Sequence, residues 1–427
     1  MIYPSHTNEK AVKKRIRIGL AAAGAAALVL TACGGGGGDD GSGTDSPGVT
    51  NLTWSMWIGS TEDQKAWEGV AAGVTADHPD IKLTLQGAPF TDYWTKISTQ
   101  LGSSAAPCVV SMQSLRINQF TESLVPLDEL ITKNKVDTAA FDAGALKNLN
   151  VGGQQYALPY DTGPVIMYYN KDMFAKAGVE PKNGWTAADF EAAGEKLKAA
   201  DAKLYANATA DVFVESMVHS YNGGRAVTDD NKIVANDPQF VAGVDWLGSL
   251  ASRGYSTTAD GADTSAADNA FIAGQAATNA NGPWVLLDFN SKVKFGLGVV
   301  ELPAGTGGGK TFSAGSGFGI SKMCKEPDKA FAAITSMTSE KTLTGLAEQG
   351  RAFPGRTASQ AAWYQTAKDV AGVEETLKAA QTASIPMPGS ADSEKFAQLL
   401  GQYIPAALNG TEPAGDALNQ IQKQIGS

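Results

Sequence analysis

The sequence predicts an α/β fold with two lobes. After residue 50, short β-type runs alternate with amphipathic helical runs, and this alternation is typical of a parallel sheet with right-handed crossovers. Roughly 375 residues follow the glycine-rich stretch near the N-terminus, which is more than one hydrophobic core usually holds. Only 18% of the residues are charged and 48 are glycine, a composition that suits a compact α/β protein.

The first elements follow the order strand, helix, strand, helix, strand. Leu52–Ile58 is a β-type run, and Ser60 or Thr61 can cap the helix predicted over Asp63–Ala76. In that helix Trp67, Val70, Ala71 and Val74 recur at helical spacing and predict its buried face. The next elements are a strand at Ile81–Leu85, a helix at Asp92–Leu101 and a strand at Cys108–Met112.

The carboxyl ends of these strands are the expected ligand side, because ligands of open α/β sheets bind outside the carboxyl ends of the strands. Trp57, Gly59 and Ser60 end the first strand, Gly87 follows the second, and Met112–Ser114 ends the third. We therefore expect these residues to lie near one another.

The later part of the chain continues the alternation less regularly. Its predicted elements are strands at Val165–Tyr169, Ala277–Ala280 and Gly315–Ile320, and helices at Ala187–Ala199, Asp237–Arg253 and Pro327–Met337. The glycine-rich strand lacks the Gly-Lys-Ser/Thr ending of a phosphate-binding loop. Its glycines indicate instead a strand that closely approaches neighbouring backbone or a ligand.

The first 32 residues predict a secretory signal peptide. Basic residues precede Ile18–Leu30, an uncharged run too short for a membrane-spanning helix, which needs about 20 residues. The following Leu-Thr-Ala-Cys33 resembles the bacterial lipobox, whose cysteine becomes the lipidated first residue of the mature chain. A polar, glycine-rich tether runs from Cys33 to residue 49. We expect a protein held by a lipid at the outer face of the cell membrane.

Charge and composition exclude several function classes. The net charge is −10 for the full sequence and becomes about −14 without residues 1–32, which argues against a nucleic-acid partner. Three scattered histidines, His6, His78 and His219, give no metal-ligand spacing and no recognisable catalytic context. We expect no metal, no cofactor and no enzymatic activity.

Several stretches, in order, resemble the family 1 extracellular solute-binding proteins, the maltose-binding-like receptors of ABC importers. The strongest is Gln155–Gly163, which continues into Tyr168–Phe174 and Ala177–Val179. The others are Asp92–Lys96, Ala280–Trp284, Gly315–Lys322 and Glu348–Pro354. The resemblance covers the chain from about residue 50 to its end.

This resemblance implies a two-lobed, type II binding-protein fold with a hinge between the lobes. Lobe one would hold residues 50–161 and 313–355, and lobe two residues 162–312 and 356–427. A solute would bind between the lobes, the lobes would close about the hinge, and the closed monomer would deliver the solute to the transmembrane permease subunits of an ABC importer. By this likeness the ligand is a carbohydrate, most simply a di- or oligosaccharide.

A sugar site needs aromatic rings for the apolar face of the sugar. Trp284 follows Asn-Gly-Pro, where family members stack on sugar, although a core tryptophan is the alternative. For Trp57, Phe213 and Tyr160 the sequence leaves open whether the ring contacts the ligand or has a structural role. Trp94 is expected in the core.

The hydroxyl groups of a sugar need carboxylate, amide or guanidinium partners. Asp161 lies at the expected crossover between the lobes and resembles the hydroxyl-binding carboxylate of the family, although a structural aspartate of the hinge is the alternative. The other candidates are Gln113, Arg116, Asp211, Ser316 and Arg351. For Gln113, Arg116 and Arg351 a solvated surface position is the alternative.

One departure from the family concerns Cys108, which stands where many members have an aspartate. In this fold the strand that ends near Cys324 lies antiparallel to the strand that begins at Cys108. The resemblance thus implies a Cys108–Cys324 disulfide within lobe one, which the chain-entropy model values at about 4–5 kcal/mol. Two buried free thiols are the alternative.

Two other classes of function stay open. Within the binding proteins, the solute could be a polyol or a glycerol phosphate diester, for which only Arg116 and Arg351 offer cations. A secreted glycoside hydrolase would need a pair of catalytic carboxylates. Asp161 and Asp211 are the candidates for such a pair. Nothing in the sequence around these two aspartates supports the hydrolase.

Overall fold

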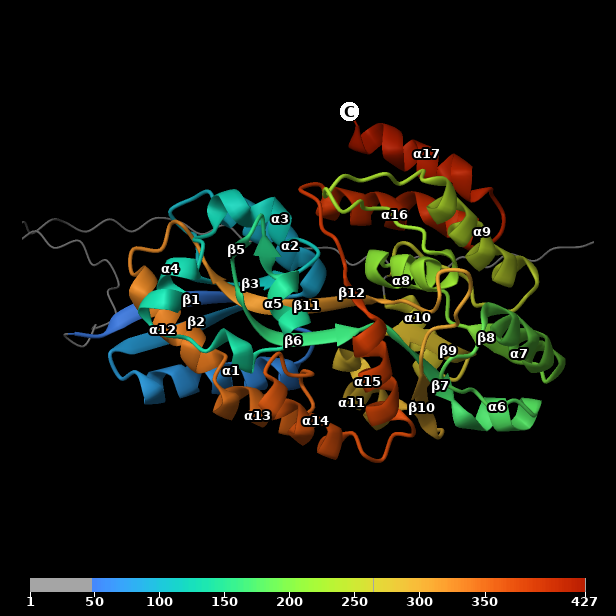
Figure 1. Ribbon diagram of the computed structural model, residues 1–427, viewed down its shortest axis with the longest axis horizontal. Coiled ribbons are helices and arrows are strands. Elements are labelled where there is room, and N and C mark those ends of the chain that lie inside the picture. Colours follow the sequence, from blue (N-terminus) through green and yellow to red (C-terminus); the bar gives the residue numbers. More distant parts are fainter. Residues whose placement is uncertain (1–47, 264, 427) are drawn as a thin grey trace, which may run out of the picture. The chain divides into compact units, whose positions relative to one another are not determined.

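The computed structural model describes residues 48–263 and 265–426. The expected signal peptide, Cys33 and nearly all of the tether lie outside these residues. Two separate sheets with helices on their faces confirm the predicted α/β fold (Figure 1). No helix within the two described ranges is long and apolar enough to cross a membrane.

The first sheet has six strands and defines lobe one. Its order is β12 (Ile385–Pro386), β11 (Phe312–Ile320), β3 (Val109–Gln113), β1 (Thr50–Trp57) and β2 (Ile81–Ala88), and β6 (Leu158–Pro164) also pairs with β11. β1 runs parallel to β2 and β3, as the alternation predicts, whereas β11 runs antiparallel to both β3 and β6. The register sets Ser316 opposite both Gln113 and Asp161.

The glycines of β11 confirm the predicted close approach of backbone. A Cβ atom at Gly317 would lie 2.5 Å from the carbonyl oxygen of Leu158, and one at Gly319 would lie 2.7 Å from that of Tyr156. These distances are below any van der Waals contact. The run Gly315–Ile320 therefore lets β11 pack tightly beside β6.

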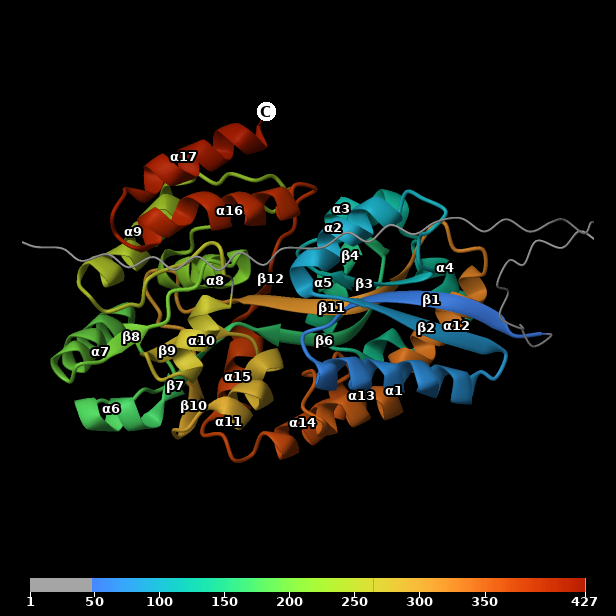
Figure 2. The same cartoon turned by 180° about the vertical axis from the view of Figure 1, so that it is seen from behind.

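Helices cover both faces of the first sheet. Figures 1 and 2 agree that α1 and α13 lie on one face and α2 and α3 on the other. The helices of lobe one are α1 (Thr61–Asp77), α2 (Phe90–Gln100), α3 (Ile117–Phe120), α4 (Asp128–Lys133), α5 (Ala143–Asn148), α12 (Pro327–Met337) and α13 (Glu340–Glu348). Helix α14 (Gln360–Thr366) follows α13 and buries Trp363 in a core that it shares with strands of the second sheet. A small hairpin joins β4 (Asn150–Val151) and β5 (Gln154–Gln155).

Helix α1 shows why the local sequence folds as it does. The Ser60 hydroxyl accepts a hydrogen bond from the backbone N–H of Asp63, which is the predicted N-cap. The four apolar residues predicted for its buried face are indeed its buried residues. Trp67 among them meets Trp54 and Phe318 edge-on, so α1 closes the core of lobe one.

The second sheet has four strands and defines lobe two. Its order is β10 (Leu297–Val300), β7 (Ile166–Asn170), β9 (Ala276–Asn281) and β8 (Lys203–Tyr205). Its helices are α6 (Lys171–Ala177), α7 (Ala187–Ala199), α8 (Asp211–Asn222), α9 (Pro238–Ser252), α10 (Ala266–Ile272), α11 (Leu286–Lys292), α15 (Val373–Ala383), α16 (Ser393–Leu408) and α17 (Ala414–Ile425). Helices α16 and α17 pack on α9, at the lobe two end of the picture.

The remaining helical turns are of the 3₁₀ type. They are η1 (Thr121–Ser123), η2 (Thr138–Ala140), η3 (Pro283–Val285) and η4 (Thr357–Ser359). Of these, η3 follows directly on the carboxyl end of β9 and carries Trp284.

The chain passes between the two sheets more than once. It leaves the first sheet where β6 leads into β7, returns where β10 leads into β11, and crosses again through β12 before α16. Extended backbone therefore connects the lobes, which is the arrangement expected of a hinge.

The two cysteines of the described chain lie side by side in lobe one. Cys108 precedes β3 and Cys324 follows β11, and the antiparallel register of these strands brings their Cα atoms to 4.6 Å. The backbone N–H of Ser321 also donates to the carbonyl oxygen of Cys108. The structure pairs the two sulfur atoms as a disulfide.

Candidate functional site

Aromatic rings gather at the carboxyl ends of β1 and β2. The half-buried Trp57 contacts Phe90, Tyr93 and Trp94 with ring centroids 5.2–5.8 Å apart. Phe90, the first residue of α2, keeps 40% of its surface exposed, whereas Trp94 is buried, as expected. A sugar face can stack on such an exposed ring. The sequence analysis missed Phe90, whose only signal was its position directly after a strand end.

Arg116 lies just past β3 and is buried, with 6% of its surface exposed. Its Nη1 donates to Gln113 Oε1 at 2.5 Å, and its Nε donates to Glu394 Oε2 at 2.7 Å. Its Nη2 is 3.9 Å from Asp211 Oδ2. The structure thus brings together three of the predicted residues, Gln113, Arg116 and Asp211, and adds Glu394, which the sequence analysis missed.

Asp161 and Ser316 also meet, on the paired strands β6 and β11. The backbone N–H of Ser316 donates to Asp161 Oδ1 at 2.6 Å. Burial raises the pKa of Asp161 to about 7, although the nearby positive charge of Arg351 and the bonds from Ser316 act in the opposite direction. This carboxyl group can therefore exchange a proton near neutral pH, and it lies where the chain passes between the lobes.

Arg351 contacts a carboxylate and a tryptophan ring, both of which belong to lobe one. Its Nε pairs with Asp63 Oδ1, and its guanidinium lies 4.9 Å from the centroid of the Trp67 ring. The other oxygen of Asp63 accepts from the backbone N–H of Gly59 at 2.7 Å. Arg351 is therefore not a free surface arginine, because its Nε is already paired inside lobe one.

Tyr160 lies in the core of lobe one. Only 1% of it is exposed, and its ring stacks on Phe318 at 4.9 Å and meets Trp67 edge-on at 5.1 Å. Of the two roles that the sequence left open for Tyr160, this burial favours support of the hinge strand over contact with a ligand.

Lobe two contributes the first turn of α8. Asp211 and Glu215 are buried there, and Phe213 between them is partly buried against the two cores of lobe two. Burial and the charge of Asp211 raise the pKa of Glu215 well above its usual value. The neutral form of Glu215 is therefore favoured.

Trp284 in η3 is half-buried and held against the hinge. A Cβ at Gly282 would lie 2.1 Å from the Trp284 ring, and a Cβ at Gly163 would lie 2.3 Å from Pro283. Only glycine therefore lets the ring lie over the backbone of η3 and lets η3 lie against β6. Trp284 thus keeps a partly exposed ring at the carboxyl end of β9.

A cluster of side-chain amides fixes the end of β9, just before η3. The Asn279 and Asn281 side chains both donate to Asp268 Oδ1 at 3.0 Å. Burial raises the pKa of Asp268 to about 6, against the effect of these two bonds. No group of three or more metal-ligating side chains occurs among residues 48–263 and 265–426.

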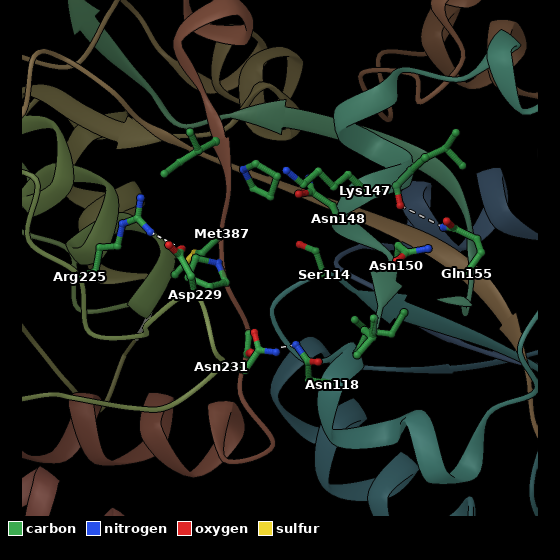
Figure 3. A pocket seen from close by; sticks show the side chains of 17 residues that line it. Ser114, Asn118, Lys147, Asn148, Asn150, Gln155, Arg225, Asp229, Asn231 and Met387 are labelled. Atoms are coloured by element: carbon green, nitrogen blue, oxygen red, sulfur yellow. Dashed lines mark hydrogen bonds and ion pairs between the residues drawn. The ribbon is translucent and has the colours of Figure 1, made fainter. Parts of the chain in front are cut away.

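A groove of about 780 Å³ lies between the lobes. None of the predicted ligand residues lines it, but Ser114 and Ile117 do, the chain neighbours of Gln113 and Arg116. Figure 3 shows Arg225 and Asp229 on one wall, Lys147 and Asn148 on the other, and Met387 between them. At one edge of this groove the Asn118 amide donates to the carbonyl oxygen of Gly389 at 2.8 Å. This volume lies within the range of small-molecule sites, about 300–1,000 Å³.

Comparisons with known proteins agree with this architecture. The model of the family "Bacterial extracellular solute-binding protein" matches residues 58–343. A probable ABC transporter-binding protein of Deinococcus radiodurans is 25% identical over 308 residues, which are 66% of this chain and 70% of that protein. The diacetylchitobiose binding protein DasA of Streptomyces coelicolor is 23% identical over 400 residues, 90% of this chain and 92% of that protein.

A solved structure supports the fold. It is an ABC substrate-binding protein of Listeria monocytogenes in complex with cycloalternan, with a TM-score of 0.78 at 23% sequence identity. The match covers 88% of this chain and 98% of that chain. This likeness shows the two-lobed fold that the sequence predicts.

Proposed function

Because this chain belongs to the bacterial extracellular solute-binding proteins, we propose that it captures a carbohydrate between its lobes and delivers it to an ABC importer. The observation that carries the proposal is the meeting of Arg116, at a strand end of lobe one, with Asp211, at the start of α8 in lobe two. Trp57, Phe90 and Trp284 would supply rings for the sugar face, and Asp161 and Asp211 would accept from its hydroxyl groups.

The charges favour a neutral ligand over a glycerol phosphate. Arg116 and Arg351 are the two cations that the sequence offers for a phosphate, and each is already paired with a carboxylate. A phosphate at either arginine would have to displace Glu394 or Asp63, which would leave a partly buried carboxylate without its partner, and that is costly. A polyhydroxylated ligand needs no such exchange. Members of this family are binding proteins, and we expect no turnover of chromogenic glycosides.

The N-terminal sequence supports an attachment to the membrane. We propose that residues 1–32 are removed, that Cys33 carries the lipid, and that residues 33–49 tether a monomeric receptor at the outer face of the membrane, beside its permease. An oxidising space there would also support the Cys108–Cys324 bond. Peptide mapping of the membrane fraction under non-reducing conditions tests both features. An unmodified Cys33, or two free thiols at Cys108 and Cys324, would contradict the respective part.

The ligand is tested with the chain from residue 46 in a thermal-shift screen against mono-, di- and oligosaccharides and glycerol phosphates. A ligand at 100 times its Kd adds about 2.7 kcal/mol to the free energy of unfolding, which raises the Tm. We expect a saturable shift with one class of sugar, lost in Trp284→Ala and largely kept in the matched variant Trp284→Phe, which retains a ring. A shift with glycerol phosphates alone, or none with any sugar, would overturn the carbohydrate proposal.

A further inference from the structure

Arg116 is held by its own lobe on two sides. Gln113 accepts from its Nη1 at 2.5 Å, and the rings of Trp94 and Phe90 lie 5.1 and 5.7 Å from its guanidinium carbon. All three neighbours belong to lobe one, at the ends of β3 and in α2. The guanidinium is therefore oriented by contacts that do not depend on lobe two.

The carboxylates that neutralise Arg116 come from lobe two. Glu394 lies in α16, which packs on α9 and α17, and it accepts from Nε at 2.7 Å. Asp211 begins α8, which also packs on α9, and its Oδ2 is 3.9 Å from Nη2. The side chains of Arg116, Asp211 and Glu394 are only 7%, 10% and 20% exposed. One cation of lobe one thus faces two carboxylates of the other lobe in a largely dehydrated setting.

A rotation of the lobes would separate these charges. Arg116 would keep Gln113 and Trp94, but Asp211 and Glu394 would lose their cation, and Asp211 already lies near Glu215. Removing one partner of a buried pair costs far more than losing an exposed pair. The contacts therefore stabilise the lobes in the arrangement seen here, and the Asn118–Gly389 hydrogen bond acts in the same direction.

We propose that Arg116, Glu394 and Asp211 form an interlobe clasp, in which Arg116 is a positioning residue that sets the closed population of the receptor without donating to the ligand. The inference rests on the proposed function, because closure matters to a receptor that binds between its lobes. When only a fraction of the molecules is competent to bind, the apparent Kd of every ligand rises by the same factor. A residue that touches the ligand would instead affect different ligands unequally.

The experiment compares Arg116→Met, Arg116→Lys and Glu394→Gln with wild type in the chain from residue 46. Arg253→Met is the matched control, because Arg253 pairs with Glu191 at 3.0 Å inside lobe two. Small-angle X-ray scattering of the ligand-free proteins measures closure, and calorimetric titration with maltose and with diacetylchitobiose measures affinity. The scattering arm needs no ligand, so it tests the clasp even if neither sugar binds and the carbohydrate proposal fails.

We expect a larger radius of gyration for Arg116→Met and Glu394→Gln and partial recovery in Arg116→Lys, with Arg253→Met equal to wild type. For each sugar that binds, the Kd should rise by a common factor of about ten or more, given the coupling of close charge pairs. Arg116→Met combined with Glu394→Gln should add little to Arg116→Met alone, since Arg116→Met already removes the contact with Glu394. Unchanged scattering in Glu394→Gln, whose residue is less buried than Arg116, would overturn the clasp. So would unequal losses of affinity for the two sugars.

Discussion

Arg116 and Arg351 have nearly the same surroundings and opposite places in the fold. Each pairs with a carboxylate through its Nε, and each lies about 5 Å from a tryptophan ring, Trp94 or Trp67. The partner of Arg351 is Asp63 in α1, so that pair lies wholly inside lobe one. The partners of Arg116 are Glu394 and Asp211, which lobe two carries.

The difference shows that local chemistry does not decide what an ion pair does. A pair inside one lobe moves as part of a rigid body and contributes to the stability of that lobe. A pair between lobes is made and broken when the hinge rotates, so its energy enters the equilibrium between open and closed forms. Which side of the hinge the partner occupies decides between these two roles.

The largest effect tests whether lobe one is the rigid frame that this comparison assumes. Cys108 and Cys324 are separated by 216 positions in sequence, and a bridge that closes so long a loop contributes about 2–5 kcal/mol. Replacing both cysteines by serine should lower the free energy of unfolding of lobe one by this amount in urea titrations. The clasp does not involve either cysteine, so ligand-free scattering should stay as in wild type.

Wild-type protein treated with a reductant is the matched control, since it should reproduce the loss without any change of side chain. A double serine variant as stable as wild type would mean that the bridge does not constrain the unfolded chain. A variant with an expanded ligand-free form would mean that closure depends on the packing of lobe one as well as on charges.

The regular elements could be predicted because their periodicity is local. Helices α7 and α12 have the predicted bounds, and α1 has the predicted cap and buried face. The alternating glycines of β11 predicted its close packing against neighbouring backbone. The end of β3 marked Gln113 and Arg116, and the structure brings both near Asp211, although the sequence could not tell whether these residues bind a ligand or one another.

The missed residues depend on contacts that no local pattern encodes. Glu394 meets Arg116 from 278 positions away, in a helix whose amphipathic pattern marks Phe396 but gives no reason to single out a glutamate. Every residue of β6 is buried, so alternation could not tell which face of this strand Tyr160 occupies. Phe90 lies outside the helix predicted from Asp92, whereas α2 begins at Phe90, and no local pattern showed that its ring would stay exposed.

The second prediction concerns Asp161, a buried carboxyl group whose pKa is lowered by the charge of Arg351. Its pKa is raised from 3.8 to about 7 by burial, so between these values the folded protein holds a proton that the unfolded chain releases. The contribution of Asp161 to stability is therefore greatest below about pH 4 and is lost as the pH rises through 7. Asp268 and Glu215, whose pKa values are also raised, cause a fall over the same range, so in Asp161→Asn the fall between pH 4 and 8 should be smaller than in wild type by on the order of 2–4 kcal/mol in urea titrations.

Asp189→Asn is the control for this titration, because hydrogen bonds from Thr186 lower the pKa of Asp189. Its contribution is lost only as the pH falls below about 4, so the variant should run parallel to wild type from pH 4 to 8. Parallel curves for Asp161→Asn and wild type over that range would show that Asp161 is ionised and hydrated in the folded protein.

The smallest effect is expected for Arg351→Met, which tests whether an arginine paired within one lobe leaves the closure of the lobes unchanged. Arg351→Met leaves Asp63 with its hydrogen bond from Gly59 but removes its cation and the guanidinium over Trp67. Lobe one should lose about 1–3 kcal/mol of unfolding free energy, and the pKa of Asp161 should rise further because Arg351 lowers it. Ligand-free scattering should nevertheless match wild type, since both partners lie in one lobe. If Arg351→Met expanded the ligand-free protein as Arg116→Met is expected to, the place of the partner across the hinge would not be what gives Arg116 its role.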